Sequence, residues 1–237
     1  MRKQSARFKI LLYHSVGEVD PEDELGIRIE RDAFYSQMEF LKEDGYDLVT
    51  LKNAVDRIEN RRDMPHKAVA VTFDDGYRDN IVNAAPVLEE FGFRATFFMA
   101  VDYIGGVKTS PKRDWQRWEC MDGDDLVRLQ DKGHIIGSHG LRHVDLTELD
   151  KKEQKNELRL SRERLGSLLK SPVDLFSYPY GSFNEGLARG VKEEGYKAAC
   201  TIVPGANDAD TDLYGLKRIE IVKGDTLADF KKKINET

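Results

Sequence analysis

Short apolar runs alternate with longer amphipathic stretches along almost the whole chain, and this alternation limits the possible folds most strongly. The predicted strands are 8–14, 46–50, 68–73, 94–100, 134–138, 174–178, 197–202 and 217–222. The predicted helices are 32–44, 51–60, 78–91, 123–132, 147–170, 184–194 and 226–235. Strands that alternate with helices form parallel sheets, and seven or eight such units favour an α/β barrel. Such a barrel carries its functional site at the carboxyl ends of the strands.

The composition favours a compact enzyme. No linker rich in proline, glycine or serine divides the 237 residues, so we expect one domain over 1–237. The net charge of −6 argues against nucleic-acid binding, which needs clustered basic residues. Cys120 and Cys200 lie far apart and fit reduced thiols. The sequence shows neither the apolar region of a signal peptide nor a membrane span, which predicts a cytoplasmic protein.

Two adjacent acids, Asp74 and Asp75, follow the predicted strand 68–73 and precede Gly76. Consecutive strand side chains point to opposite faces, so both acids can serve one pocket only where the strand ends and bends. Gly76 permits such a bend. Neighbouring carboxylates repel each other unless a cation or a proton lies between them. The pair therefore indicates a metal site, a general base or both, with an ordinary Asp-Gly turn as the alternative.

A pair of histidines, His139 and His143, follows the predicted strand 134–138. On one helical turn a spacing of four residues puts both imidazoles on the same side, where they can share a divalent ion. Neutral imidazole suits zinc, nickel, cobalt or iron, and one carboxylate would complete a three-ligand catalytic site. The chain has only five histidines, which makes this pair notable. A histidine pair without a functional role is the alternative.

Three segments resemble, in their order, the first three motifs of the NodB-type polysaccharide deacetylases, carbohydrate esterase family 4. They are TFDDG at 72–76, His-x-x-x-His at 139–143 and YPYG at 178–181. The resemblance extends over roughly residues 8–222. It implies a distorted (β/α) barrel of about seven strands, one divalent metal ion bound by Asp75, His139 and His143, and Asp74 as the general base. Zinc suits this ligand set best, and cobalt, nickel or iron would also fit.

The implied reaction is hydrolysis of the N-acetyl group of an amino sugar. A metal ion lowers the pKa of a water molecule that it binds, and a neighbouring carboxylate can accept the proton. Attack on the amide carbonyl places charge on its oxygen, which the metal and a backbone N–H can stabilise. The third motif implies that the N–H of Tyr180 has this role. Taken without the resemblance, the segment around Tyr180 is a plain turn after a strand.

The chain departs from the usual third motif, which carries an arginine that tethers the base. Phe176-Ser177-Tyr178 stands there instead. Arg218, in the predicted strand 217–222, is the candidate replacement, and a surface arginine is the alternative.

A second departure concerns the general acid, which the family takes from a C-terminal Leu-x-His motif. No histidine follows His143, but Leu12-Tyr13-His14 ends the first predicted strand. First and last strands are neighbours in a closed barrel, so the chain is similar to the circularly permuted branch that includes bacterial poly-N-acetylglucosamine deacetylases. This assigns His14 as the general acid, with a histidine that merely packs at a strand end as the alternative.

Aromatic residues in a predicted strand-end loop offer a sugar-binding surface. Aromatic rings can stack on the apolar faces of sugars. Trp115 and Trp118 are therefore candidates to line a sugar subsite, or they only cover the helix predicted over 123–132.

The predicted partner is an N-acetylated amino sugar in a polysaccharide, an oligosaccharide or a glycan precursor. The missing export signal favours a lipid-linked or nucleotide-linked amino sugar or a short oligosaccharide, and removal of a formyl or another small acyl group belongs to the same class of reaction. A metal-dependent hydrolase of another amide, or a catalytically silent carbohydrate-binding protein of the same fold, are the other hypotheses.

Overall fold

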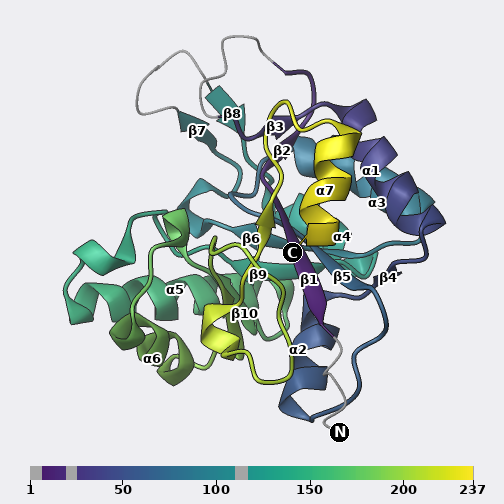
Figure 1. Cartoon of the computed structure of the whole chain (residues 1–237). Helices are drawn as coiled ribbons and strands as arrows, with labels where there is room; N and C mark the ends of the chain where they lie inside the picture. Colours follow the sequence, from purple (N-terminus) through teal and green to yellow (C-terminus); the bar gives the residue numbers. More distant parts are fainter. Residues whose placement is uncertain (1–6, 20–25, 110–116, 237) are drawn as a thin grey trace, which may run out of the picture.

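A mostly parallel sheet, curled into a barrel, forms the centre of the protein (Figure 1). The computed structural model describes residues 7–19, 26–109 and 117–236. In spatial order the strands are β11 (Ala198–Cys200), β10 (Leu175–Ser177), β9 (Ile135–Ser138), β6 (Ala95–Met99), β5 (Ala68–Phe73), β1 (Phe8–Tyr13) and β12 (Ile219–Glu220). A parallel bridge between Cys200 and Leu216, just before β12, joins the two ends of this order. The predicted barrel of about seven strands is therefore confirmed.

The first strand lies between β5 and the last strand. Phe8–Tyr13 pairs in parallel with Ala68–Phe73 on one side, and Leu11 and Leu12 pair with Ile219 and Glu220 on the other. The prediction that His14 lies at the site depended on the first and last strands being neighbours, as they are here. Another short strand, β4 (Asp47–Leu48), pairs with the beginning of β5.

Alternate residues of the central strands pack into two different apolar clusters, as the two-residue period of a strand requires. Phe8, Ile10 and Ala70 belong to an inner cluster, which also receives one face of α2 (Leu51–Glu59). Leu11 and Val71 belong to the larger cluster between the sheet and the outer helices. Because both faces are covered, all six residues of β5 are buried.

The other helices flank the sheet at the predicted places. They are α1 (Arg31–Glu43), α3 (Ala85–Glu90), α4 (Gly123–Asp131), α5 (Lys151–Leu169), α6 (Glu185–Glu193) and α7 (Leu227–Glu236). The helix expected over 147–170 begins only at Lys151, because Asp150 caps it and accepts a hydrogen bond from the Glu153 N–H. The helix expected over 78–91 consists of a π-helical turn, Asn80–Ala84, followed by α3.

Two small strand pairs lie outside the barrel. β2 (Ser15–Val16) pairs with β3 (Arg28–Ile29), and β7 (Val107–Thr109) pairs with β8 (Arg117–Glu119). Figure 1 shows β7 and β8 together at the upper edge of the molecule, beyond the upper end of β1. Within the residues described, none of the helices combines the length and the apolar character that crossing a membrane requires.

Candidate active site

A cavity of about 330 Å³ opens at the carboxyl ends of the strands and collects most of the predicted site residues. Its lining includes His14, Asp74, Asp75, Lys108, Trp118, His139, His143 and Tyr180. Segments that are far apart in the sequence thus supply one pocket. A larger surface groove between α5 and α6, of about 480 Å³, contains none of these residues.

Asp74 lies directly after β5, where its N–H still donates to the Tyr13 carbonyl. The Arg218 guanidinium forms two parallel hydrogen bonds with the carboxylate of Asp74, at 2.8 and 2.6 Å. Ser177 belongs to the segment that replaces the arginine of the usual third motif, and it donates a further hydrogen bond to Asp74. Arg218 is only 1 % exposed, so the alternative of a surface arginine is wrong. Burial raises the pKa of Asp74, but Arg218 and His139 outweigh this effect and lower the pKa to about 2.

The backbone bends sharply after Asp74, as we expected from the presence of Gly76. Asp75 has a φ of +73° and Gly76 a φ of +74°. A Cβ atom on Gly76 would lie 2.0 Å from the Met99 sulfur, so any larger residue here would have to displace the buried Met99 side chain and adopt a positive φ. The bend lets both neighbouring acids serve the same cavity.

His139 and His143 face Asp75 from a loop that follows β9, and their ring centroids are 4.9 Å apart. The helical turn considered for this pair is wrong, because Gly140 and His143 both adopt positive φ angles, +79° and +56°. The rings still meet because the loop folds back on itself. His139 Nδ1 lies 2.8 Å from the Ser177 carbonyl, which can only accept, so the proton is on Nδ1 and Nε2 carries a lone pair.

Asp75, His139 and His143 fit a divalent metal ion. One ligand atom from each residue lies within 4.8 Å of the other two. The Oδ1 atom of Asp75 is 2.9 Å from His143 Nε2 and 3.6 Å from His139 Nε2. Ligands of a tetrahedral zinc ion, about 2 Å from the metal, are roughly 3.3 Å apart. Burial lowers the pKa of His139 to about 4, which keeps this imidazole neutral, as metal binding requires.

Lys108, which the sequence analysis did not consider, places a positive charge at the same carboxylate. Its Nζ is 2.8 Å from the Oδ1 atom of Asp75. The ammonium group also lies over the rings of Tyr77 and Tyr103. Burial raises the pKa of Asp75, but the hydrogen bond from His143 and the charge of Lys108 lower it well below its usual value. The carboxylate therefore already attracts a cation in this structure.

His14 lies in the same cavity at the end of β1. Its Nδ1 atom is buried and has no hydrogen-bond partner among the residues described. The carbonyl of His14 accepts a hydrogen bond from the buried Asn80 amide, which fixes the backbone here. His14 is thus a residue of the pocket and not only a packing residue outside it.

The aromatic candidates differ in their positions. Tyr180 is 59 % exposed at the rim of the cavity, has a φ of +59° and lies edge-on to the His143 ring. Trp118, on β8, is 5 % exposed, lines the cavity and contacts Tyr77. Trp115 lies outside the described residues. Tyr180 therefore offers a larger open ring face to a ligand than Trp118.

The polysaccharide deacetylase family profile matches residues 61–199. The chain belongs to this family, which confirms the resemblance seen in the motifs. It is similar to the Bacillus subtilis protein YxkH, named as a polysaccharide deacetylase, with 28 % identity over 94 % of this chain and 74 % of the relative. It is also similar to the poly-β-1,6-N-acetyl-D-glucosamine N-deacetylase of Escherichia coli, with 22 % identity over 96 % of this chain but only 38 % of that protein.

A solved structure supports the fold over the same length. The deacetylase PplD of Streptococcus pyogenes, determined in complex with acetate, has a TM-score of 0.85. It is 21 % identical, and the likeness covers 98 % of this chain and 99 % of PplD. Membership of the family identifies the chain as an enzyme that acts on amide bonds of a polysaccharide.

Proposed function

We propose that the protein is a metal-dependent N-deacetylase that hydrolyses the N-acetyl groups of amino sugars. The main support is the convergence of Asp74, Asp75, His139 and His143 with His14 in one cavity of a chain that belongs to the polysaccharide deacetylases. Five such groups have no packing role that requires them together. A catalytically silent carbohydrate-binding protein would not need this arrangement.

Asp75, His139 and His143 would bind the metal ion, for which zinc suits the ligand set best. When bound, a divalent ion lowers the pKa of a water molecule and polarises the amide carbonyl. The residues around it supply the remaining functions. Ser177 holds the His139 ring through its carbonyl, which presents the Nε2 lone pair to the site.

Asp74 is the proposed general base. Its low pKa keeps the carboxylate ionised at neutral pH, so that it can accept a proton. The two hydrogen bonds from Arg218 fix the plane of the carboxylate, and the hydrogen bond from Ser177 adds a third restraint. Arg218 and Ser177 together replace the arginine that the third motif lacks.

His14 is the proposed general acid, because it is the remaining imidazole in the cavity once the two ligands are assigned. It would protonate the nitrogen of the sugar as the amide bond breaks. Tyr180 is proposed to act through its backbone N–H on the charge that develops at the carbonyl oxygen. Its exposed ring, with Trp118 deeper in the cavity, offers an apolar contact for the sugar.

The test combines metal content with acetate release from N-acetylglucosamine oligomers in the same samples. Wild-type protein is compared with His139→Ala, Asp74→Asn and the control His66→Ala, which changes an exposed histidine outside the cavity. We expect one divalent ion and acetate release in wild type and control. His139→Ala should lose both, whereas Asp74→Asn should keep the metal and lose acetate release. A wild-type protein that binds no divalent ion under any supplementation would contradict the proposal.

A lipid-linked or nucleotide-linked amino sugar is the second candidate substrate. The rim of the cavity carries exposed apolar groups, with Tyr180 at 59 % and Ile202 at 45 % exposure, which suit an apolar or aromatic carrier group. Metal bound without acetate release from oligomers would favour these substrates, or an N-formyl or other small acyl group on the sugar.

A further inference from the structure

In the loop between His139 and His143, two backbone N–H groups bond to a side-chain carboxylate instead of to backbone carbonyls. The N–H groups of Leu141 and Arg142 both donate to the Oε2 atom of Glu157, at 2.8 and 3.1 Å. Glu157 lies on α5, whereas the proposed metal ligands follow the ends of strands. Two successive N–H groups that converge on one carboxylate oxygen define the conformation of the loop.

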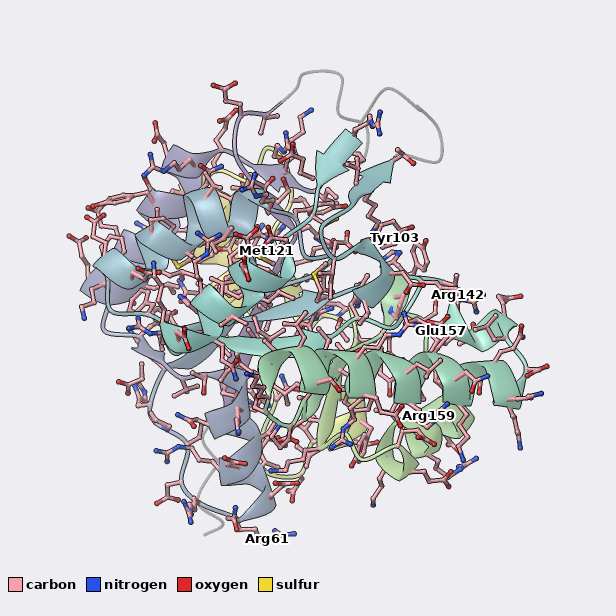
Figure 2. The ribbon with its side chains drawn as sticks, turned by 180° about the vertical axis from the view of Figure 1, so that it is seen from behind. Arg61, Tyr103, Met121, Arg142, Glu157 and Arg159 are labelled. Atoms are coloured by element: carbon pink, nitrogen blue, oxygen red, sulfur yellow. The ribbon has the colours of Figure 1, made fainter. Side chains whose placement is uncertain are left out.

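The Glu157 side chain is only 1 % exposed, so water has little access to replace these bonds. Its second oxygen accepts a hydrogen bond from the Arg142 side chain, which is half-exposed. Figure 2 shows Arg142 and Glu157 next to each other beside α5. Removal of the carboxylate would leave the buried N–H of Leu141 and the partly buried N–H of Arg142 without this partner.

The opposite side of the loop is also fixed. The carbonyls of Gly140 and Leu141 accept hydrogen bonds from Val101 and Asp102, at 3.1 and 2.9 Å. Gly140 has a positive φ, and a Cβ atom there would lie 3.5 Å from the Glu157 carboxylate. The segment after β6 therefore holds the loop carbonyls, Ser138 accepts from the Gly140 N–H, and Glu157 accepts from the N–H groups of Leu141 and Arg142.

The positive φ of His143 connects this loop to the site. A residue with a side chain is strained at a φ of +56°, and such a conformation persists only where neighbouring contacts enforce it. The two backbone N–H groups immediately before His143, those of Leu141 and Arg142, both bond to Glu157. They stabilise the turn that brings His143 Nε2 to 2.9 Å from Asp75.

We propose that Glu157 is a positioning residue for the metal site: it holds the loop 140–142 so that His143 faces Asp75 and His139. The inference rests on the proposed function, since it requires a metal ion at these three residues. A role in stability only would change the unfolding temperature and leave the affinity for metal unaltered.

The experiment measures Co²⁺ affinity and the visible absorption of the Co²⁺-loaded protein, together with thermal unfolding. Glu157→Leu removes both acceptor oxygens, and we expect a dissociation constant raised about 10- to 100-fold and an altered Co²⁺ spectrum. Glu157→Gln keeps one acceptor oxygen but sets an NH₂ group against the Arg142 side chain. Arg142→Met removes this conflict, so the double variant Glu157→Gln/Arg142→Met should bind Co²⁺ within about threefold of wild type.

The control is Asp125→Asn. Asp125 is another buried carboxylate, 1 % exposed, that accepts a backbone N–H and pairs with Arg78 and Arg128. It lies on α4 and contacts none of the three ligands. We expect a lower unfolding temperature with unchanged Co²⁺ affinity.

Wild-type affinity in Glu157→Leu would overturn the role of Glu157 and leave the proposed function intact. If Glu157→Leu does not fold, wild-type Co²⁺ affinity in Glu157→Gln would overturn it as well. A wild-type protein that binds no Co²⁺ would instead reject the metal-dependent function, and the role of Glu157 with it.

Discussion

Arg218 and Asp74 form a buried ion pair across 144 residues of sequence. Both side chains are nearly inaccessible to water, at 0 and 3 % exposure. A buried pair of this kind contributes little compared with apolar residues of the same shape, but the loss of one partner leaves an uncompensated charge. The geometry of Asp74 therefore depends on the planar fork of an arginine and not only on its charge.

Replacement of this arginine should affect stability and catalysis together. We expect Arg218→Met to lower the free energy of unfolding by about 3 kcal/mol, because the Asp74 carboxylate stays buried without its partner. The free energy of unfolding of Arg218→Lys should lie between those of wild type and Arg218→Met, since lysine keeps the charge but not the two parallel hydrogen bonds. Urea unfolding and kcat for N-acetylglucosamine oligomers are the measurements. An Arg218→Met protein with the wild-type urea midpoint would contradict the role of the pair.

Lys108 should oppose metal binding. Its ammonium group is 2.8 Å from the Asp75 oxygen, and a divalent ion has to compete with it for this carboxylate. We expect Lys108→Met to bind Zn²⁺ at least about tenfold more tightly, measured by competition with a chelator. Lys52→Met is the control, because Lys52 pairs with Asp174 outside the cavity. Equal or weaker Zn²⁺ binding by Lys108→Met would show that the lysine does not compete.

At the scale of elements, β9 begins beside a buried histidine, His134, that does not line the cavity. His134 is 1 % exposed, and its Nδ1 atom accepts a hydrogen bond from the Ala95 N–H at the start of β6. Burial and the nearby Arg94 lower the pKa of His134 from 6.5 to about 4. The folded protein therefore keeps this histidine neutral at pH values where the unfolded chain protonates it.

This difference predicts acid sensitivity. Between pH 6.5 and 4 the unfolded state binds a proton that the folded state does not, so stability falls as the pH falls through this range. The full loss is about 3 kcal/mol. His134→Asn keeps an acceptor for Ala95 but does not titrate. Urea unfolding of both proteins from pH 7 to 4 should show their stability difference changing by this amount, and parallel curves would contradict it.

The helices and strands were largely predictable from the sequence, because apolar periodicity and caps are local. The strand 68–73 has the predicted bounds, since its apolar run ends abruptly at charged Asp74. The helical turn for His139 and His143 was wrong, because spacing alone cannot distinguish a helix from a loop that folds back. Gly140 was the available indication, since a glycine between the two histidines permits a positive φ.

At the scale of the whole molecule, the site depends on the closure of the barrel. Motif order located Asp74, Asp75, His139 and His143, and the adjacency of first and last strands placed His14. Lys108 and Glu157 were not predictable, because they are charged residues in a chain where 34 % of residues are charged, and only the fold shows which of them are buried. Such contacts depend on tertiary structure and have no local pattern.

Metal binding should stabilise the entire domain, because Asp75, His139 and His143 come from two different strand ends that unfolding separates. At a free concentration one hundred times the dissociation constant, the gain is about 2.7 kcal/mol. For a domain of this size this corresponds to a rise of roughly 5–10 °C in Tm. Zn²⁺ should produce this shift in wild type, and neither His139→Ala with Zn²⁺ nor wild type with Mg²⁺ should show it. An equal shift in His139→Ala would place the ion elsewhere.

The position of β1 between β5 and β12 has a consequence for synthesis on the ribosome. β1, which ends directly before His14, leaves the ribosome long before β12, so one of its edges stays unpaired until β12 has been translated. An open strand edge invites pairing with other chains. Nascent chains stalled before Arg218 would therefore expose this edge and lack the partner of Asp74, so translation of the last strand limits both solubility and the onset of activity.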